Sequence, residues 1–530
     1  EISSSLIKGA LAVHKEVSDT FRKTAANFHY SFNIRHLANV FQGLLVATPG
    51  IFNDPEKLCY LWLHESERVY GDRLVDYDDL NKFKQIMQSQ ARKSFAQFNV
   101  ARYYLSGGGV KADPLVFCHF ADTSQPSGDD SDLAYDQALN ISDLRTTLEG
   151  ALQEYNDTSA AMNLVLFDDA VLHVARIVRI VKQTGGHALL VGVGGSGKQS
   201  LSKLSAYICG YTCVQIMVGQ HYGMVDFKTD LQSMYNKAGI KLEGVLFLIT
   251  DTQIVNEKFF IYLNDLLSSG NIPDLYSRDE KETIINSVTN KAKANGYTSD
   301  PVDVWKYFIS KIRENLHVCL CFSPVGPSLR TRARRFPALA SCTVIDWFQP
   351  WPEQALASVG KNMLKDVDLG TPEILLAVEH FMPTAFVAVN HMCKTFAQNE
   401  GKNVYTTPKS YLEMIGLFLS MLASKRVEID ASINRLANGV EKLMQAADDV
   451  VELEANLQIM LTSAEEQRQL AEGIAQTVKE EKEIVDAENA KALVEAEKVA
   501  AMQEEVAKQA ASAAKDLELA EPAVLKAMAA

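Results

Sequence analysis

The chain has 530 residues, 47% of them hydrophobic, and a formal net charge of −14. This length predicts several domains, and the acidic balance argues against a surface that neutralises nucleic-acid phosphates, because such surfaces are basic. No apolar run reaches the roughly 18 to 20 residues that a membrane-spanning helix needs, so we expect neither nucleic acid nor membrane as a partner.

The eight cysteines show no paired C-x-x-C spacing suited to a zinc site, and we interpret them as reduced, buried thiols of a cytosolic protein. They are Cys59, Cys118, Cys209, Cys213, Cys319, Cys321, Cys342 and Cys393. The start, EISSSLIKGA, lacks an initiator Met and the form of a signal peptide. With the abrupt end in KAMAA, it indicates an excerpt from a longer chain.

Helices are predicted over residues 1 to about 105, where FNIRHLANVFQGLL and DYDDLNKFKQIMQSQARKSF place apolar residues at spacings of 3 and 4. This is a lid-like helical block without a strand-rich core. A stretch rich in Gly, Asp, Ser and Pro follows, from SGGGVKADP to TSQPSGDDSD, and encloses the short apolar run LVFCHFA. That composition marks a domain boundary.

Five short apolar runs alternate with amphipathic segments between about residues 160 and 345. They are HALLVGV, CVQIMV, GVLFLIT, HVCLCFS and CTVIDWF. The alternation predicts an α/β fold with a parallel sheet covered by helices. Residues 346 to about 424 return to helix only.

A coiled-coil helix is predicted from about residue 429, because apolar steps of 3 and 4 residues continue without proline until Pro522. Continued to about residue 520, the rod would be on the order of 130 to 140 Å long. Its exposed seam requires a partner helix outside this chain or in another copy of it. The seam runs through Leu436, Val440, Leu443, Ala447, Val450, Glu454, Leu457, Leu461, Ala464, Arg468, Ala471, Ala475, Val478, Lys482 and Val485.

The stretch LLVGVGGSGKQSL follows a predicted strand, opens a predicted helix and contains the G-x-x-x-x-G-K pattern of a phosphate-binding loop. Its glycines let backbone N–H groups turn toward phosphate oxygens, and the helix directs its positive end at them. Lys198 would reach the β- and γ-phosphates; the alternative is a chance glycine loop. The predicted nucleotide-binding residues here are Gly192, Val193, Gly194, Gly195, Ser196, Gly197, Lys198, Gln199 and Ser200.

Gln199 stands where such a loop carries the Ser or Thr whose hydroxyl binds Mg²⁺. Ser200 cannot replace that hydroxyl, since one residue along a helix is about 100° of rotation. An amide oxygen suits Mg²⁺ poorly, because the ion prefers compact octahedral ligands. We expect a site that holds nucleotide well and metal indifferently.

A second element, GVLFLITDTQ, is an apolar strand that ends in Asp251, the place of the Mg²⁺-supporting acid of a Walker B strand. Thr252 stands where a Glu would activate water, and a hydroxyl is no general base near pH 7. The alternative for Asp251 is a helix N-cap.

A third element, SLRTRARRFP, brings Arg330, Arg332, Arg334 and Arg335 just before the fifth predicted strand. An arginine that reaches a neighbour's γ-phosphate stabilises the transferred charge. We expect Arg332 or Arg334 to be such an arginine finger; the alternative is a basic helix face paired with acids.

LSGG, at residues 105–108, matches the core of the ABC signature and suggests a chromosome-maintenance ATPase. The motif precedes the P-loop here, whereas it follows the P-loop in that class, and Gly109 stands in place of Gln. We therefore set this interpretation aside.

Several longer stretches resemble a dynein heavy chain in the region of its fourth AAA+ module and the start of its stalk. They include LWLHESERVYGDRLVDYDDL, MNLVLFDDAVLHVARI, NDLLSSGNIPDL and CFSPVGPSLRTRARRFPALASCTVIDWFQPWPEQAL. The KQS after the P-loop lysine and the strand end TDTQ are more similar to axonemal than to cytoplasmic dyneins, and to an outer-arm chain in particular.

The resemblance implies four parts of the chain. Residues 1–110 would be the helical lid of the third module, 111–345 the α/β subdomain of an AAA+ P-loop NTPase module, 346–424 its helical lid, and 425–530 the outgoing stalk helix. It also implies a microtubule motor of the cytoskeleton in a ciliary or flagellar axoneme. The partners would be the rest of the heavy chain with its returning stalk helix, a microtubule through a tip absent here, and intermediate and light chains.

The same resemblance gives roles to single residues. Arg35 would be the sensor-2 arginine of the third module, on whose site the arginines of SLRTRARRFP would act. Val165 and Leu166 would lie near the adenine of ATP or ADP, and Ser323 would take the sensor-1 place, which often carries Asn. Lys409 would be a sensor-2 residue; its alternative is a surface lysine at a helix start.

Gln199, Thr252 and Ser323 all depart from the pattern of an active site, with Asp251 the one predicted Mg²⁺ ligand. We therefore expect a nucleotide that serves as a structural or regulatory ligand and is hydrolysed slowly or not at all. Two alternatives stay open: an active ATPase in which Gln253 or a neighbour's residue positions water, and a structural ring segment with an empty P-loop.

Overall fold

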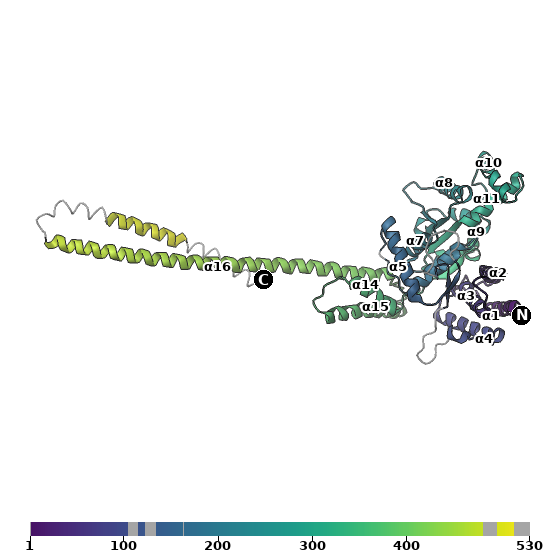
Figure 1. Cartoon of the computed structure of the whole chain (residues 1–530), viewed down its shortest axis with the longest axis horizontal. Coiled ribbons are helices and arrows are strands. Elements are labelled where there is room, and N and C mark those ends of the chain that lie inside the picture. The colour runs from purple at the N-terminus through teal and green to yellow at the C-terminus, as the bar shows by residue number, and fades with distance from the viewer. Residues whose placement is uncertain (1, 104–114, 122–133, 163, 481–495, 513–530) are drawn as a thin grey trace. The chain divides into compact units, whose positions relative to one another are not determined.

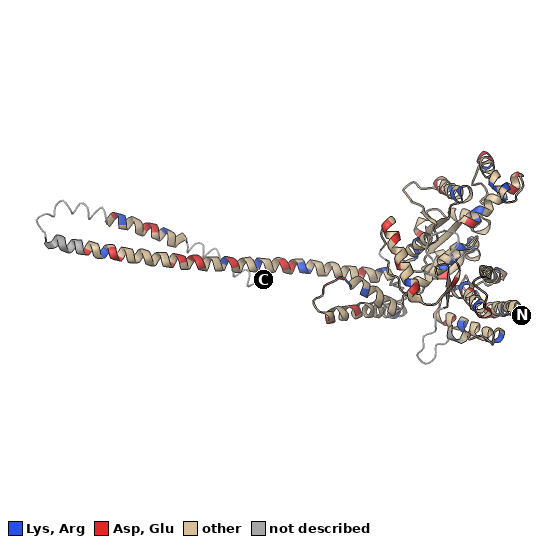
Figure 2. Cartoon of the chain, viewed as in Figure 1, with Lys and Arg blue, Asp and Glu red and all other residues tan. Residues whose placement is uncertain are grey.

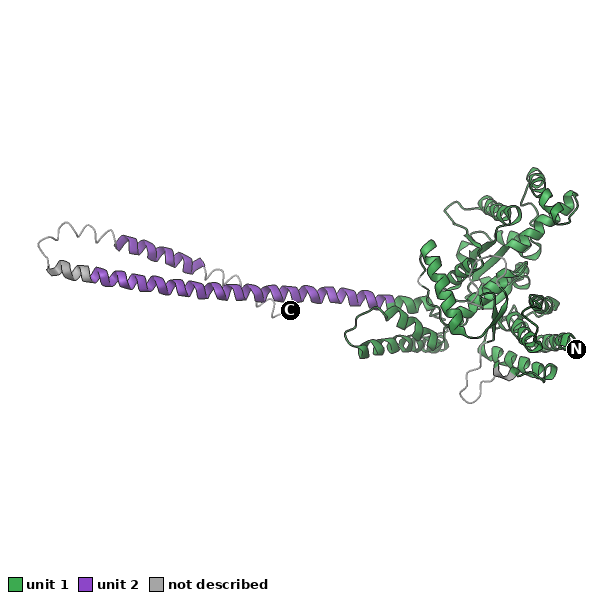
Figure 3. Ribbon diagram, in the orientation of Figure 1, with its two compact units in different colours: residues 1–415 green, residues 416–530 purple. Residues whose placement is uncertain are grey.

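A computed structural model describes residues 2–103, 115–121, 134–162, 164–480 and 496–512 (Figure 1). The chain divides into two compact units, residues 1–415 and residues 416–530 (Figure 3). The first unit contains an N-terminal helical block, an α/β subdomain and a helical lid. The second consists of most of one long helix and a further helical stretch, 496–512.

The N-terminal block is built from helices, as the spacing of its apolar residues predicted. They are α1 (Ile2–Thr20), α2 (Ile34–Leu44), α3 (Pro55–Ser66) and α4 (Tyr77–Ser94), with a π-helical turn at Glu67–Gly71 and a 3₁₀ turn at Val100–Tyr103. Asn33 caps α2 and Asp54 caps α3, each through its side-chain oxygen. Trp62 is fully buried at the centre of the block's core.

The central sheet has five parallel strands in the order β4-β5-β6-β3-β7. They are β3 (Ala188–Val191), β4 (Thr212–Gln215), β5 (Val245–Thr250), β6 (Leu316–Phe322) and β7 (Val344–Trp347). All five predicted strands are confirmed. Because β3 lies between β6 and β7, the loop after it opens near the middle of the sheet's carboxyl edge.

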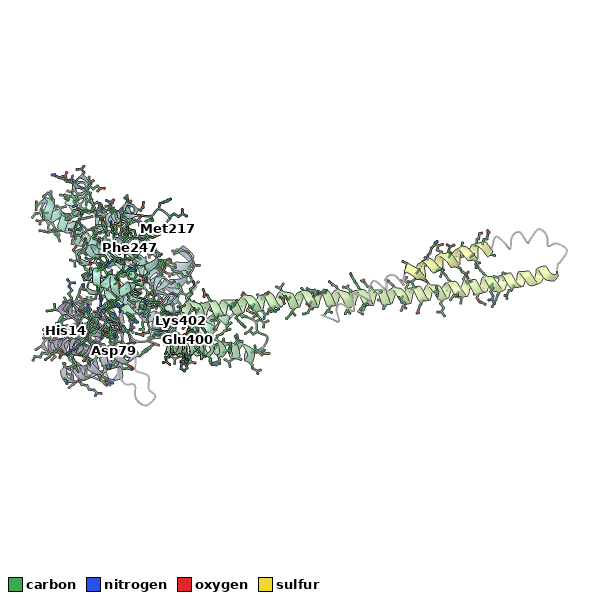
Figure 4. All side chains as sticks on the ribbon, turned by 180° about the vertical axis from the view of Figure 1, so that it is seen from behind. His14, Asp79, Met217, Phe247, Glu400 and Lys402 are labelled. Carbon is green, nitrogen blue, oxygen red and sulfur yellow. The ribbon has the colours of Figure 1, made fainter. Side chains whose placement is uncertain are left out.

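Helices cover both faces of the sheet, and alternate residues of β5 show how. Val245, Phe247 and Ile249 enter the core on the side of α8 to α11, whereas Leu246 and Leu248 enter the core on the side of α5 to α7. Figure 4 shows Phe247 inside this region. The helices are α5 (Ile141–Thr158), α6 (Asp168–Lys182), α7 (Lys198–Ile208), α8 (Met224–Tyr235), α9 (Phe259–Ser269), α10 (Arg278–Ala294) and α11 (Pro301–Asn315).

A two-stranded antiparallel sheet, β1 (Val116–Cys118) with β2 (Asp136–Ala138), was not predicted from the run LVFCHFA. Phe117 packs into the core of the N-terminal block, while Val116 and Cys118 pack into the core beside α6. Because alternate residues of this strand point to opposite sides, the strand packs against both the helical block and the α/β subdomain.

The helical lid follows α12 (Ser328–Arg335), α13 (Ala338–Ser341) and β7. It contains α14 (Glu353–Leu364), α15 (Pro372–Glu400) and the first turns of α16, where the Tyr411 hydroxyl donates to the Leu356 carbonyl at 2.8 Å. Gly401, with φ of 65°, ends α15 between Glu400 and Lys402, both marked in Figure 4.

One described helix, α15, is long and apolar enough to cross a membrane by length and composition alone, which differs from the expectation that no such segment exists. Only 17% of its apolar window is buried within the unit. A single helix of this kind is weak support for a membrane span.

The longest helix, α16 (Pro408–Glu480), has 73 residues and passes residue 425 without a break. The lid and the predicted rod therefore share one helix, and the two compact units divide within it, between residues 415 and 416, close to the predicted boundary at residue 425. The seam side chains Leu436, Val440 and Leu443 are 41 to 56% exposed. Figure 2 shows acidic and basic residues interspersed along this helix. Residues 481–495 of the predicted rod lie outside the described part.

Candidate nucleotide-binding site

A cavity of about 750 Å³ opens at the carboxyl ends of β3, β5, β6 and β7, where open α/β sheets bind ligands. Most of the predicted site residues line it: Val165, Gly192, Gly194, Gly195, Ser196, Gly197, Lys198, Gln199, Ser200, Asp251, Thr252 and Ser323. Val193 and Lys409 are not among the lining residues, and Leu166 is buried in the core beside α6. One cavity thus collects elements from distant parts of the sequence.

The phosphate-binding loop joins β3 to α7 and has the backbone that its glycines allow. Gly195 and Gly197 have φ of 76° and 87°, which favours glycine. Lys198 is 8% exposed, and its Nζ donates to the carbonyls of Gly192 and Val193 at 2.7 Å each. Burial lowers the pKa of this amine, opposed by nearby acidic groups. The lysine lies along the loop and needs only a side-chain rotation to meet a phosphate.

Two glycines of this loop are close to other elements. A Cβ on Gly192 would lie 2.7 Å from Cβ of Phe348, and a Cβ on Gly195 would lie 3.0 Å from the backbone nitrogen of Lys409. The first turn of α16 therefore packs on the phosphate-binding loop. The Lys409 side chain is exposed and its Nζ lies 3.5 Å from a carboxylate oxygen of Glu413.

Asp251 follows β5 directly and has both carboxylate oxygens engaged. Oδ2 accepts from the backbone N–H of Ser323 at 2.6 Å, and Oδ1 accepts from Nη1 of Arg332 at 2.9 Å. Burial raises the pKa of Asp251, while the Ser323 N–H and the Arg332 guanidinium oppose the shift. Arg332 also donates to Oε1 of Glu257 through Nε at 3.0 Å and Nη2 at 2.9 Å.

The expected role of Arg332 as a finger for a neighbouring module stays a prediction, but in this structure Arg332 faces the acid of its own module. The physical reason is the pair of carboxylates, which together accept three hydrogen bonds from one guanidinium. Arg334, two residues further along α12, is exposed, so the finger role for that residue stays a prediction.

Residues Asp251–Gln253 form a 3₁₀ turn, and the side chains nearest the position of a catalytic base are engaged in hydrogen bonds. Gln253 Oε1 accepts from the backbone N–H and hydroxyl of Thr250 at 2.9 and 3.0 Å, and its Nε2 donates to the Ile216 carbonyl at 2.7 Å. Thr252 is exposed, with its hydroxyl 3.0 Å from that of Thr250. Both ends of the Gln253 amide are engaged, so this residue holds the turn rather than a water.

Magnesium fits these residues poorly. The hydroxyl that normally follows the P-loop lysine is replaced by Gln199, an exposed amide. The second expected ligand, Asp251, is already neutralised by a guanidinium and a backbone N–H. Octahedral coordination at about 2.1 Å demands compact oxygen ligands, and the two positions expected to supply them carry an amide and a carboxylate that is already engaged.

Aromatic residues line the cavity beyond the phosphate-binding loop, and the sequence analysis did not single them out. Phe167 and Trp351 meet edge to face with ring centroids 5.0 Å apart, and His173 stacks on Phe348 with centroids 3.8 Å apart. Together with Val165 they offer an apolar surface to a planar base. The aromatic cluster WFQPW after β7 was the available signal.

A buried ion pair ties α3 of the N-terminal block to α6 of the α/β subdomain. Arg179 Nε donates to Oε1 and Oε2 of Glu65 at 3.1 and 3.0 Å, and the Tyr135 hydroxyl donates to Oε1 at 2.7 Å. Burial alone would raise the pKa of Glu65, but Arg179 and the hydrogen bond from His64 outweigh it, and the pKa is lowered.

A second set of buried charges continues toward the cavity. Asp72 accepts from Nε of Arg68 at 2.6 Å and lies 3.3 Å from Nε of Arg176. Arg176 Nη1 donates to Asp346 at 2.9 Å, and the other oxygen of Asp346 lies 2.6 Å from Nδ1 of His173. Because Arg176 and His173 line the cavity, the N-terminal block is connected to it through a set of largely buried charges.

Arginines also gather where the N-terminal block meets α12. Arg35 Nη1 lies 3.1 Å from the sulfur of Cys342, and Arg330 Nη1 donates to the carbonyl of Ala25 at 3.2 Å. Arg35 therefore belongs to the junction of the block with this module and does not line the cavity.

Two family models match the chain. A model described as the P-loop containing dynein motor region D4 matches residues 162–421, and a model of the AAA+ lid domain matches residues 6–101. The first range contains the whole phosphate-binding loop and most of the cavity lining, whereas the lining residues between Glu67 and Lys84 lie outside it. The second coincides with the N-terminal helical block.

Known relatives extend over nearly all of the chain. The dynein alpha chain of the flagellar outer arm of Chlamydomonas reinhardtii is 49% identical over 452 residues, 85% of this chain and 10% of that one. The ciliary dynein beta chain of Tripneustes gratilla is 42% identical, and human dynein axonemal heavy chain 17 is 43% identical, each over 99% of this chain and 12% of the relative. The chain thus spans about a tenth of their length. These identities, with a dynein-specific model over the cavity, show that the chain belongs to the axonemal dynein heavy chain family.

Proposed function

We propose that the cavity binds ADP or ATP as a structural or regulatory ligand and hydrolyses it slowly or not at all. One observation supports this most: the phosphate-binding loop is complete, yet Thr252 stands where a base is needed and the neighbouring Gln253 amide is engaged at both ends. General acid–base assistance is worth roughly 10² to 10⁴ in rate, so its loss separates binding from turnover.

Different residues of the cavity bind different parts of the nucleotide. The backbone N–H groups of the loop and the N-terminus of α7 face the phosphates, and Lys198 supplies a positive charge there. Phe167, Trp351 and Val165 receive the base. Thr252 offers a hydroxyl but no proton acceptor, so the bound phosphate is held rather than attacked.

An empty P-loop is the second candidate, because Lys198 already has acceptors without any ligand. Its Nζ donates to Gly192, Val193 and Ser196. A structural segment with no nucleotide would need nothing more. Nucleotide that co-purifies with the chain would exclude this candidate.

Replacing Lys198 by Ala tests the binding proposal. We expect nucleotide retention to be lost, because backbone N–H groups alone leave much of the phosphate charge uncompensated. Lys203→Ala, on the same helix and outside the cavity lining, is the matched control and should retain nucleotide. Unchanged affinity in Lys198→Ala would contradict the assignment of the loop.

Slow hydrolysis is tested by restoring the missing groups. Thr252→Glu with Gln199→Thr supplies a base and a metal-binding hydroxyl, and turnover at this module should rise by at least about tenfold, a modest part of the acid–base range. No gain, with nucleotide and Mg²⁺ both shown to be bound, would mean that Ser323 or a neighbouring module limits the reaction.

For the whole protein we propose a microtubule motor in which this module lies between the rest of the heavy chain and the stalk. The relatives are named for the flagellar outer arm, the cilium and the axoneme, which supports an axonemal location. The microtubule, the returning stalk helix, and the intermediate and light chains are then the partners.

The contact between Gly195 and the first turn of α16 supports a regulatory role, since the helix that becomes the stalk begins against the phosphate-binding loop. A nucleotide that shifts this loop would shift the helix. The seam contains Glu454 and Arg468 among its apolar residues, so its packing is weak enough for two registers. Two packings a few kcal/mol apart form an element that the nucleotide can bias.

A further inference from the structure

The Arg332 side chain is held in place by contacts within its own module. Its side chain is 14% exposed, and its guanidinium carbon lies 5.0 Å from the centroid of Phe260 and 6.0 Å from that of Phe322. Three of its hydrogen bonds go to Asp251 and Glu257. Aromatic faces on one side and carboxylates on the other fix this guanidinium.

The partner of Arg332 is the acid that faces the phosphate site. Asp251 lines the cavity, and its charge acts on Lys198 of the phosphate-binding loop. A bare carboxylate there would repel a di- or triphosphate. In most P-loop enzymes a divalent cation removes that repulsion by binding the acid, the loop hydroxyl and the phosphate together.

In this chain the hydroxyl is missing and the acid has a guanidinium in place of a metal. We propose that Arg332 is a tethered cation of the nucleotide site, which neutralises Asp251 and makes nucleotide binding independent of divalent metal. This inference rests on the proposed nucleotide binding and adds a positioning residue to it. Arg332 acts through Asp251 and touches no phosphate.

The test measures ADP affinity of the full 530-residue chain with Mg²⁺ and with excess EDTA. The wild-type chain should bind ADP with dissociation constants within about threefold of each other, because its metal ligands are absent or occupied. In Arg332→Gln the affinity in EDTA should fall by about tenfold or more, as expected when a charged hydrogen-bond partner is removed. Mg²⁺ should then restore part of it, since Asp251 is free to bind the ion.

Arg332→Lys keeps the positive charge and should keep the metal independence, which a purely structural role of the arginine would not require. Arg335→Gln, an exposed residue of the same helix, is the control and should behave as wild type. If Arg332→Gln does not fold, Asp251→Asn replaces it. That variant should bind ADP in EDTA at least as tightly as wild type, because it removes the repulsive charge and leaves the guanidinium.

Three results would overturn the proposal. The first is a wild-type affinity that falls about tenfold or more in EDTA, which is the normal behaviour of a metal-dependent site. The others are an Arg332→Gln chain whose affinities match wild type in both conditions, and an Asp251→Asn chain that binds ADP more weakly than wild type in EDTA. Failure of the proposed function has a different signature, since the wild-type chain would then bind no ADP with or without Mg²⁺.

Discussion

Removing Arg179 should destabilise the first unit severely, because the variant leaves a buried carboxylate without its main counter-charge. Glu65 is 0% exposed and Arg179 has 3% of its side chain exposed, so water cannot replace the lost guanidinium. Breaking a buried pair by removing one partner costs about 3 to 5 kcal/mol. We expect Arg179→Met to lower the free energy of unfolding by that amount.

The double variant Glu65→Leu with Arg179→Met should recover at least about 2 kcal/mol of the loss, since the uncompensated charge is gone and only the hydrogen bonds of His64 and Tyr135 to Glu65 are lost with it. Guanidinium denaturation followed by tryptophan fluorescence measures both variants, with Trp62 reporting from the block's core. Lys306→Met removes an exposed pair and should cost less than about 1 kcal/mol.

The pH dependence of the unfolding free energy tests the same reasoning independently. In wild type the pKa of Glu65 is lowered, so its stabilising contribution is present above the unfolded pKa and lost as pH falls through the folded value. Without Arg179, burial raises that pKa, so Arg179→Met should lose stability as pH rises through neutrality and come closer to wild type in acid. A single-variant cost below about 1 kcal/mol, or a double variant equal to the sum of the singles, would refute the buried-pair reasoning.

Three further predictions concern other parts of the chain. Gly195→Ala should weaken nucleotide retention and increase hydrogen exchange in the first turn of α16, because φ is 76° and the added Cβ meets Lys409, whereas Gly150→Ala, on α5 and outside the cavity lining, has open space and should change neither. Burial lowers the pKa of His187 to about 3, so this residue alone adds one proton to the uptake on unfolding below pH 6.5 and contributes a fall in stability of about 1.4 kcal/mol per pH unit from there toward pH 3; His187→Gln should reduce the measured proton uptake on unfolding by about one. In the intact motor, a cysteine at Ala464 should cross-link to the returning helix in two pairings, each with its own microtubule affinity; one pairing under all nucleotide conditions would make the stalk a passive spacer.

The strands and the phosphate-binding loop could be predicted because their signals are local. An apolar run of four to seven residues followed by glycines and a lysine specifies strand, turn and helix without reference to the rest of the chain. The β1 strand was missed because only three residues, Val116–Cys118, pair with a partner about twenty residues away. So short a run, set between turn-forming residues, reads as part of a loop.

Partnerships between charges could not be predicted. Arg332 and Asp251 are 81 residues apart, and Arg179 and Glu65 are 114 apart, so nothing in the local pattern assigns one to the other. A charge in an amphipathic helix is usually solvated, and the sequence analysis assigned no partner to the charges of LWLHESERVYGD. Only the packing of α3 against α6 shows that several of them are buried.

The predicted boundary near residue 425 lies inside one continuous helix, α16, and the two compact units divide within that helix, between residues 415 and 416. Composition changes where a helix leaves a folded core, but the backbone hydrogen bonds continue. A shift toward Ala, Glu and Lys therefore locates the end of packing and not the end of an element.

The buried ion pairs between the N-terminal block and α6 determine where the chain can be divided for expression. A chain cut at the Gly-rich stretch near residue 110 would separate Arg176 and Arg179 from Asp72 and Glu65, and each half would expose or bury unmatched charge. The backbone N–H of Trp347 also donates to the carbonyl of Asp72 across the same junction. The N-terminal helical block and the α/β subdomain thus form one structural piece, and a chimera between relatives should exchange residues 1–345 together.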